Sequence, residues 1–409
     1  MISSVLCVVL AVSGQTARYG EIRKDEIEYQ QEAFKAWWGS DLVRKLDDLP
    51  TESIVPEYRV PYAGHDYPDH SGGTVAALAK YDRAFNAGQQ SAVAFERSDI
   101  SGHGRYGSSG GGTRRGLFGR IRRSSGPPSW YGHCNGWTAA TIRHAEPQNN
   151  VVRNGVTFTP ADIKGMLAEI YMYSPTEFLG GLDNAINPAT LHLVLCNWLG
   201  RGSHPVGMET ALGEVVINFP VYSYKVAIEK LSDKQYDCRM SIRYAMNTPR
   251  EYDKGPKFNR TLAFHYALDL DDEGNITGGR YYGDTNQIDM LWTPLKPVQG
   301  GEKGNERGNP YLNVKEVLAI WRESVPEEIR KQWLNIDPTD EDRLPEADEA
   351  KPAEATASAD PAATPATPAV PAEAPATAGT TPAPAATTPA TPAPAATTPA
   401  TPAAESDLP

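Results

Sequence analysis

Apolar residues recur at helical spacing in several stretches of the chain. In residues 18–50 they lie three or four positions apart, which predicts one or two amphipathic helices. This stripe consists of Phe34, Trp37, Trp38, Leu42 and Leu46. A short helix is predicted over residues 74–88. A longer helix should follow Thr159, which can cap it, because Pro160 suits the first helical position.

The second half of the chain mixes strand and helix patterns. Residues 264–284 alternate apolar and polar side chains around Glu273-Gly274-Asn275, which predicts a β-hairpin. The apolar run 192–200 and the segment ending at Glu209 are predicted strands, and residues 311–334 a helix closing over the sheet. We therefore predict an α+β fold in which helices pack on an antiparallel sheet.

Three segments differ in composition from the rest of the chain. Residues 1–17 hold an apolar run followed by small residues, which resembles a secretory signal peptide without the usual basic start. Residues 101–128 are rich in glycine and arginine and should form an exposed flexible loop. Residues 346–409 are mostly alanine, proline and threonine, with TPAPAATTPA repeated from positions 381 and 391, and should not bury a core.

These boundaries give five predicted regions. They are a signal peptide (1–17), an N-terminal helical region (18–100), a flexible loop (101–128), a catalytic core (129–345) and a disordered tail (346–409). Because exposed basic loops are preferred cleavage sites, we hypothesise that residues from 18 to about 120 form a pro-region released by cutting near Arg123. A solvated linker and a polyanion-binding loop are the alternatives for residues 101–128.

Charge and hydropathy exclude two classes of protein. The chain has 409 residues and a formal net charge of −12, which argues against a nucleic-acid binder. Apart from residues 1–17, no apolar run approaches the ~20 residues that a membrane span requires. We therefore predict an exported protein without a membrane span.

The segment Trp130–Ala145, WYGHCNGWTAATIRHA, is the main candidate for chemistry. It follows Pro127-Pro128, and its small and apolar residues suit a buried helix, which places Cys134 at or just before a helix N-terminus. Unpaired N–H groups there favour a thiolate and can stabilise the oxyanion of a tetrahedral intermediate. The alternative is a structural cysteine, since free cysteines are usually buried and inert.

The remaining cysteines permit one disulfide. If Cys7 leaves with the signal peptide, three cysteines remain, and an odd number allows one bridge and one free thiol. The pairing consistent with a free Cys134 is Cys196–Cys238.

Two stretches contain residues that ligate metals. His65, Asp66, Asp69 and His70 could hold zinc or manganese, but ordinary turn chemistry is the simpler interpretation, so we predict no metal site. The hairpin turn at 269–274 mimics the start of a calcium loop, yet position twelve is Arg280 rather than glutamate. Calcium is therefore the one cofactor left open, and a plain turn is expected.

Several segments together resemble one family. Residues Val216–Val226 read VINFPVYSYKV, which is similar to the peptide VWNQPVRGFKV of secreted Phytophthora transglutaminases, the transglutaminase elicitor family. Ile217 stands where the family has tryptophan. With GHCNGW, NGVTFTPADIK and NITGG, the resemblance extends over residues 55–300. It implies a papain-like or transglutaminase-like core with a cysteine nucleophile.

Such an enzyme needs a histidine that moves protons and an acceptor that orients it. The intervals of the superfamily favour Cys134, His192 and Glu209 as the catalytic residues, although Asn187-Pro188 could instead begin a helix containing His192, and the superfamily normally has Asp or Asn at the position of Glu209. Two other pairs remain open, His204 with Asn218 and His265 with Asp284.

The resemblance implies a protein-glutamine γ-glutamyltransferase. Cys134 would form a thioester with a glutamine side chain, and a lysine amine would resolve it into an isopeptide. The expected partners are proteins carrying glutamine and lysine, and the expected location is secreted or in the cell envelope, held there by the Pro/Ala/Thr tail. The alternatives are a cysteine protease or amidase, and a catalytically inactive envelope protein.

Overall fold

Long alternating segments in the second half of the chain pair into an antiparallel sheet. The computed structural model describes residues 20–106, 126–181, 185–255, 257–283 and 285–332. In this part of the chain, eight strands form one sheet with the order β4-β10-β5-β6-β7-β8-β9, and β1 pairs with β6 beside this path. The strands are β1 (Glu52–Ile54), β4 (Thr176–Gly181), β5 (Val206–Glu209), β6 (Asn218–Ser232), β7 (Gln235–Ala245), β8 (Asn259–Leu270), β9 (Ile276–Tyr281) and β10 (Met290–Pro294).

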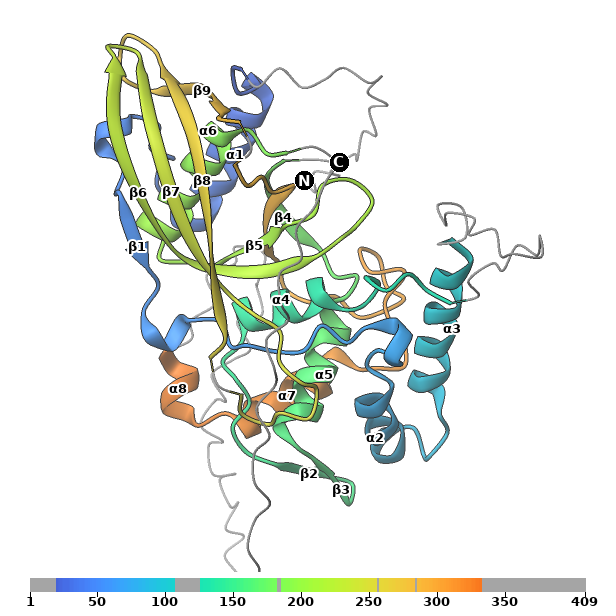
Figure 1. Cartoon of the computed structure of the whole chain (residues 1–409). Coiled ribbons are helices and arrows are strands. Elements are labelled where there is room, and N and C mark those ends of the chain that lie inside the picture. The colour runs from blue at the N-terminus through green and yellow to red at the C-terminus, as the bar shows by residue number, and fades with distance from the viewer. Residues whose placement is uncertain (1–19, 107–125, 182–184, 256, 284, 333–409) are drawn as a thin grey trace, which may run out of the picture. The chain divides into compact units, whose positions relative to one another are not determined.

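One set of helices covers the long strands of this sheet. It consists of α1 (Lys24–Trp38), α6 (Pro188–Val194) and the wider π-helical segment η4 (Leu195–Arg201), and Figure 1 shows α1 and α6 behind β6–β8. Their apolar residues share one hydrophobic core with the sheet, including Phe34, Trp37 and Trp198. The predicted stripe is helical only in part: Phe34 and Trp37 are buried on α1 and Trp38 is partly buried. Leu42 and Leu46 are buried as well, but they follow the end of α1 at Trp38.

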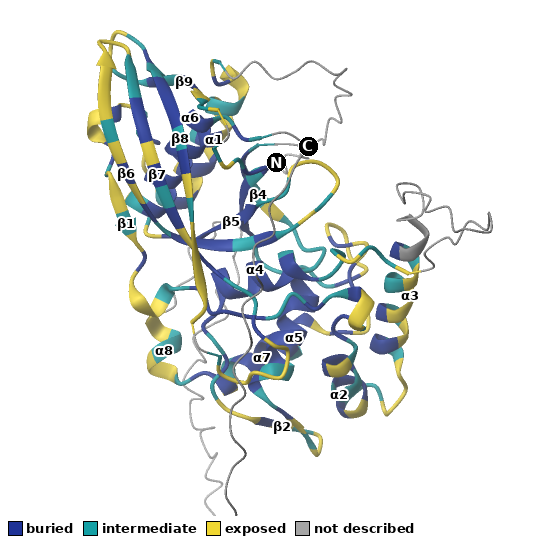
Figure 2. Cartoon of the chain, viewed as in Figure 1, coloured by how far each residue is buried: buried dark blue, intermediate teal, exposed yellow. Residues whose placement is uncertain are grey.

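A second core lies among helices at the other end of the sheet. It is built from α2 (Val75–Phe85), α3 (Ser91–Tyr106), α4 (Cys134–Arg143), α5 (Pro160–Tyr171) and α7 (Val314–Ser324), with α8 (Glu327–Gln332) after it. The small hairpin of β2 (Val151–Arg153) and β3 (Val156–Phe158) borders this core. Helices α4, α5 and α7 are largely buried (Figure 2). Short 3-10 turns η1 (Leu46–Asp48), η2 (Glu57–Arg59) and η3 (Asp69–Ser71) connect the N-terminal elements.

Local signals placed several elements correctly. The side chain of Thr159 caps α5, as predicted, and Asp162 reciprocates to complete a capping box. The predicted hairpin is β8–β9, and Asp271 accepts hydrogen bonds from the backbone N–H groups of Glu273 and Asn275 in its turn. The carboxylate therefore stabilises a plain turn.

Two secondary-structure predictions were wrong. The apolar run 192–200 is helical, because Asn187 caps α6 and Pro188 occupies its first position. The predicted closing helix is divided into α7 and α8 before Pro326, and α7 packs on α5 and β2 rather than over the large sheet. A helix interior does not accommodate proline, which explains the break.

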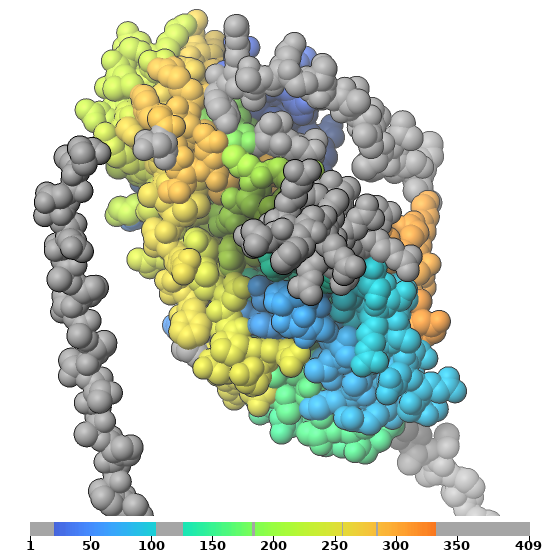
Figure 3. Space-filling view, turned by 45° about the vertical axis from the view of Figure 1, so that its right-hand side comes forward, coloured from blue at the N-terminus to red at the C-terminus, as the bar shows by residue number. Residues whose placement is uncertain are grey.

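The N-terminal residues are integrated into the fold. Strand β1 pairs with β6, and isolated bridges join Glu21 to Gly278 and Gly64 to Asn247. In Figure 3 the blue surface around residues 60–70 accordingly lies beside the yellow surface around residue 250. The described residues from 20 to 106 contribute to both hydrophobic cores, so removing a pro-region that ends near residue 120 would disrupt both. The predicted cleavage position at Arg123, like the signal peptide and the tail, lies outside the described residues.

Candidate active site

Helix α4 begins at Cys134, as the sequence predicted. The turn before it is fixed by a hydrogen bond of 2.7 Å from the backbone N–H of His133 to the carbonyl of Asp66. One turn into the helix, Gly136 lets α4 pack directly on α5, since a Cβ atom there would lie 2.1 Å from the carbonyl oxygen of Ala168. These contacts hold the Cys134 side chain, which is 9% exposed, at the junction of helices and sheet.

The sulfur of Cys134 lies against the first residues of β6. The backbone N–H of Asn218 donates to Sγ at 3.4 Å and its side-chain Nδ2 at 3.7 Å, while the thiol lies 3.7 Å from the carbonyl of Val216. Two donors from one residue therefore face the sulfur. They are placed to stabilise negative charge on it or on an adjacent oxygen.

Asn218 is itself held in place from the neighbouring strands. The indole Nε1 of Trp292 on β10 donates to Asn218 Oδ1 at 2.8 Å, which orients Nδ2 toward the sulfur. Between them on β5 is Gly207, where a Cβ atom would come within 2.4 Å of the Trp292 ring. Because Gly207 has no side chain, the indole of Trp292 can lie across β5.

Burial dominates the electrostatics of the thiol. It raises the pKa of Cys134, the hydrogen bonds from Asn218 lower the pKa in part, and the negative charge of Asp66 raises it further. The net direction is upward, so the thiol holds its proton in this conformation at neutral pH. The acidified thiolate expected from a helix N-terminus is corrected here, because desolvation outweighs the helix and its N–H groups.

The structure does not bring His192 to Cys134. His192 is fully buried in α6, where Nδ1 bonds the hydroxyl of Tyr266 at 2.8 Å. Its Nε2 has no hydrogen-bond partner among the described residues, and burial lowers its pKa to about 4. The ring is a neutral core residue against β8, and its helix packs on β4, β8 and β9, whereas α4 packs on β5, β6 and β10.

The alternative histidines also have partners elsewhere. The ring of His204 bonds the carbonyl of Pro205 at 2.6 Å and packs edge-on against Trp37 and Trp198. His265 Nε2 bonds the carboxylate of Asp237 at 2.7 Å on the half-exposed surface of β8. Its predicted partner Asp284 lies outside the described residues.

The two residues predicted to orient a histidine, Glu209 and Asn218, lie opposite each other on β5 and β6. Glu209 is buried at the end of β5 and is the cross-strand partner of Asn218, so both side chains project from the same face of the sheet. Asn218 contacts Cys134 directly, without His204. The sequence therefore named two residues of this region, and it missed Trp292, whose spacing carried no signal.

The predicted disulfide is absent from the structure. Cys196 and Cys238 are free and fully buried thiols in the core of the sheet. Burial raises the pKa of each to about 12, which makes both unreactive.

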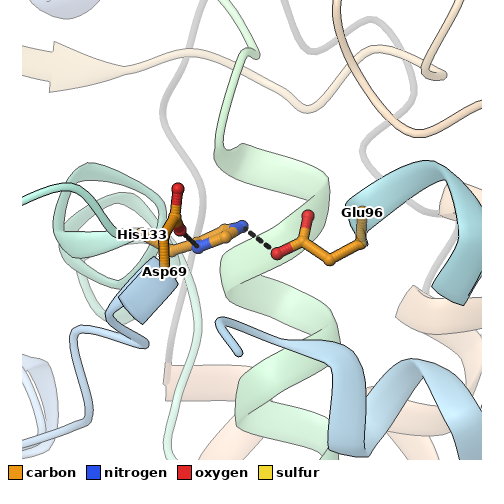
Figure 4. Close-up of side chains that lie close together, drawn as sticks. All are labelled: Asp69, Glu96 and His133. Carbon is orange, nitrogen blue, oxygen red and sulfur yellow. Dashed lines mark ion pairs between the residues drawn. The ribbon is translucent and has the colours of Figure 1, made fainter. Parts of the chain in front are cut away.

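A second group of ionisable side chains lies directly behind the cysteine turn. His133 faces Asp69 and Glu96 (Figure 4), and its Nε2 is 3.1 Å from the carboxylate of Glu169 on α5. Burial alone would lower the pKa of His133, but Glu96 and Glu169 together raise it to about 10. Of the four residues proposed from sequence as metal ligands, only Asp69 takes part in this group.

The comparisons with known proteins centre on the same turn. Residues 120–182 match the sequence model of the transglutaminase elicitor family. This range includes Cys134 and all of α4 and α5. Over this segment the chain is similar to the transglutaminase elicitor family. The family predicted from the sequence is thereby confirmed.

The elicitor-type segment also lies within a shared fold. The chain is similar to the crystal structure of the GP42 transglutaminase from Phytophthora sojae, with a TM-score of 0.60 and 23% sequence identity. The match covers 74% of this chain and 98% of that chain, which confirms the α+β, transglutaminase-like fold. No curated protein matches the chain. Among the described helices, none is both long and apolar enough to cross a membrane.

Proposed function

We propose that this chain is a secreted protein-glutamine γ-glutamyltransferase with Cys134 as its nucleophile. The observation that supports this most is the position of the sulfur: it lies at the first residue of α4, inside the elicitor-family segment, and faces both donors of Asn218. Secretion is inferred from the apolar residues 1–17.

The reaction would run in two balanced steps. Cys134 Sγ attacks the carbonyl carbon of a glutamine side chain, the C–N bond breaks, and the thiol proton leaves with the nitrogen as ammonia. A lysine amine then attacks the thioester, forms the isopeptide and returns a proton to the sulfur. The N–H groups of Asn218 are placed to stabilise the oxyanion in both steps.

This proposed reaction does not use His192 as the proton acceptor. Its ring is buried against Tyr266, so we assign it a structural role. The carboxylate whose charge acts on the thiol is Asp66, beside the cysteine turn. Glu209 stays a predicted member of the site through its place opposite Asn218. Because the thiol is protonated in this conformation, its proton must leave before or as the sulfur attacks.

Amine incorporation tests the proposal. Full-length protein is incubated with casein and a labelled primary amine, and both label incorporation and peptide-bond hydrolysis are measured. We expect incorporation that Cys134→Ser abolishes, and that Cys196→Ser and His192→Gln retain per folded molecule, since both are buried away from the sulfur. Hydrolysis without incorporation would identify a protease or amidase. Unchanged activity in Cys134→Ser would refute the nucleophile.

The second candidate is a catalytically inactive protein with the same fold. The raised pKa of Cys134 favours it, because a buried thiol is a poor nucleophile. Mild iodoacetamide treatment distinguishes the two when alkylation is mapped by mass spectrometry. Alkylation at Cys134, with Cys196 and Cys238 unmodified, is expected for the enzyme, and an unmodified Cys134 in the folded protein for the inactive form.

A further inference from the structure

Three buried side chains from separate segments converge behind the cysteine turn. Asp69 comes from η3, Glu96 from α3 and His133 from the residue before α4, and they are 3%, 2% and 3% exposed. One ligand atom from each lies within 4.8 Å of the others. Figure 4 shows the imidazole between the two carboxylates, with Nδ1 3.8 Å from Asp69 Oδ1 and Nε2 3.6 Å from Glu96 Oε1.

Two oxygens in this cluster lack the partners that buried carboxylates normally have. Asp69 Oδ1 and Glu96 Oε1 are buried and accept no hydrogen bond from the described residues. Both face the space around His133. A buried carboxylate oxygen without a donor has lost its hydration without a compensating hydrogen bond, which is unfavourable. The oxygens therefore point to a cation that is shared between them.

The surrounding groups orient the cluster in the way that outer groups orient metal ligands. The other oxygen of Asp69 bonds His103 Nδ1 at 2.6 Å, and His133 Nδ1 lies 3.4 Å from the carbonyl of Tyr67. The neighbouring carboxylate of Glu169 bonds the hydroxyl of Thr74 and Asn309 Nδ2, and it also lies 3.1 Å from His133 Nε2. Such second partners fix tautomer and rotamer in protein metal sites.

We propose that Asp69, Glu96 and His133 bind one divalent transition-metal cation. A mixed set of one imidazole and two carboxylates suits Zn²⁺ or Mn²⁺, whereas Ca²⁺ and Mg²⁺ prefer oxygen ligands alone. The cation would replace a proton on the imidazole, so binding releases protons and strengthens as pH rises.

The site would tie α3 to the turn that carries Cys134. His133 precedes Cys134, and its backbone N–H is bonded to Asp66, so a cation on its ring fixes the start of α4 from behind. The role is structural: the sulfur contacts Asn218 of β6, whereas the three proposed ligands come from η3, α3 and the residue before α4. The cation would therefore bind whether or not the chain transfers acyl groups.

Metal titration of the full-length protein is the direct test. The protein is stripped with a chelator and titrated with Zn²⁺, Mn²⁺, Ca²⁺ and Mg²⁺ by calorimetry, with circular dichroism as a check of folding. We expect one equivalent of Zn²⁺ or Mn²⁺ per chain, a raised Tm, and affinity at least about 10-fold above that for Ca²⁺ or Mg²⁺. Failure to bind either transition metal would overturn the proposal and leave an ion-pair network.

Two kinds of variant test whether the cation binds at this cluster. Glu96→Gln keeps the shape and removes the charge, and should weaken binding at least about 100-fold, since even orienting residues contribute 10–100-fold. Gly73→Ala would put a Cβ atom 2.4 Å from Glu96 Oε1, while Gly72→Ala meets nothing within 4 Å and has the same positive φ class (φ +51° and +90°). We expect only Gly73→Ala to weaken binding.

An experiment on the wild-type protein locates the cation without relying on variants that could misfold. Crystals soaked with Mn²⁺ or Zn²⁺ should give one anomalous-scattering peak within about 2.3 Å of an oxygen of Asp69, an oxygen of Glu96 and a ring nitrogen of His133. A peak elsewhere, or Glu96→Gln binding within threefold of wild type while folded, would refute the assignment.

Discussion

The hydrogen bond between Trp292 and Asn218 is buried, so its loss should lower the free energy of unfolding by a predictable amount. The two residues are 3% and 2% exposed, and the bond from Nε1 to Oδ1 is 2.8 Å long. Asn218→Ala leaves the indole N–H buried without an acceptor, and Trp292→Phe leaves the amide oxygen without a donor. Each orphaned group destabilises by about 1–3 kcal/mol, apart from the loss of side-chain volume.

The double variant lacks both groups, so neither is left unpaired. We expect the sum of the two single losses in the free energy of unfolding to exceed the loss in the double variant by about 1–2 kcal/mol. Urea unfolding followed by far-ultraviolet circular dichroism measures the three differences. This signal does not depend on the replaced tryptophan.

A remote tryptophan provides the control cycle. The indole of Trp321 donates to the carbonyl of Ala145 at 2.9 Å rather than to Asn218. Combining Trp321→Phe with Asn218→Ala should therefore be additive within about 0.5 kcal/mol. If the Trp292 cycle is equally additive, the bond does not hold Asn218 against the cysteine, and our account of the site is refuted.

Two further predictions concern packing and pH. In a thermal unfolding assay, Gly136→Ala should destabilise the protein by about 3 kcal/mol, because its Cβ atom would meet the backbone oxygen of Ala168 at 2.1 Å. The control is Gly102→Ala in α3, where a Cβ atom meets nothing within 4 Å. It should be neutral or stabilising by up to about 1 kcal/mol. Equal losses would contradict the close α4–α5 approach. For His192, burial lowers the folded pKa from 6.5 to about 4, so its contribution is fully present above pH 6.5 and is lost as pH falls toward 4. That loss amounts to about 3 kcal/mol at most, and His192→Gln should flatten the dependence of unfolding free energy on pH between 6.5 and 4; parallel curves would show that the ring is not buried neutral.

Local sequence determined the elements whose signals are local. The glycine and proline residues before Cys134 placed the start of α4, and Thr159 with Asp162 placed the start of α5. Each signal lies within seven residues of the boundary it sets, because caps and turns act on nearby N–H groups. The α+β class and the family followed from such segments. Where two patterns competed, as at 192–200, periodicity alone did not separate a buried strand from a buried helix.

Only the tertiary structure decided what surrounds the sulfur. Asn218 is 84 residues from Cys134 and Trp292 a further 74 from Asn218, and they meet because β10, β5 and β6 are neighbours in the sheet. Strand order depends on which apolar faces can be buried together across the whole chain, so no spacing in the sequence encodes it. Burial likewise reversed the expected acidity of Cys134, since the field at a buried atom sums contributions from every segment packed around it.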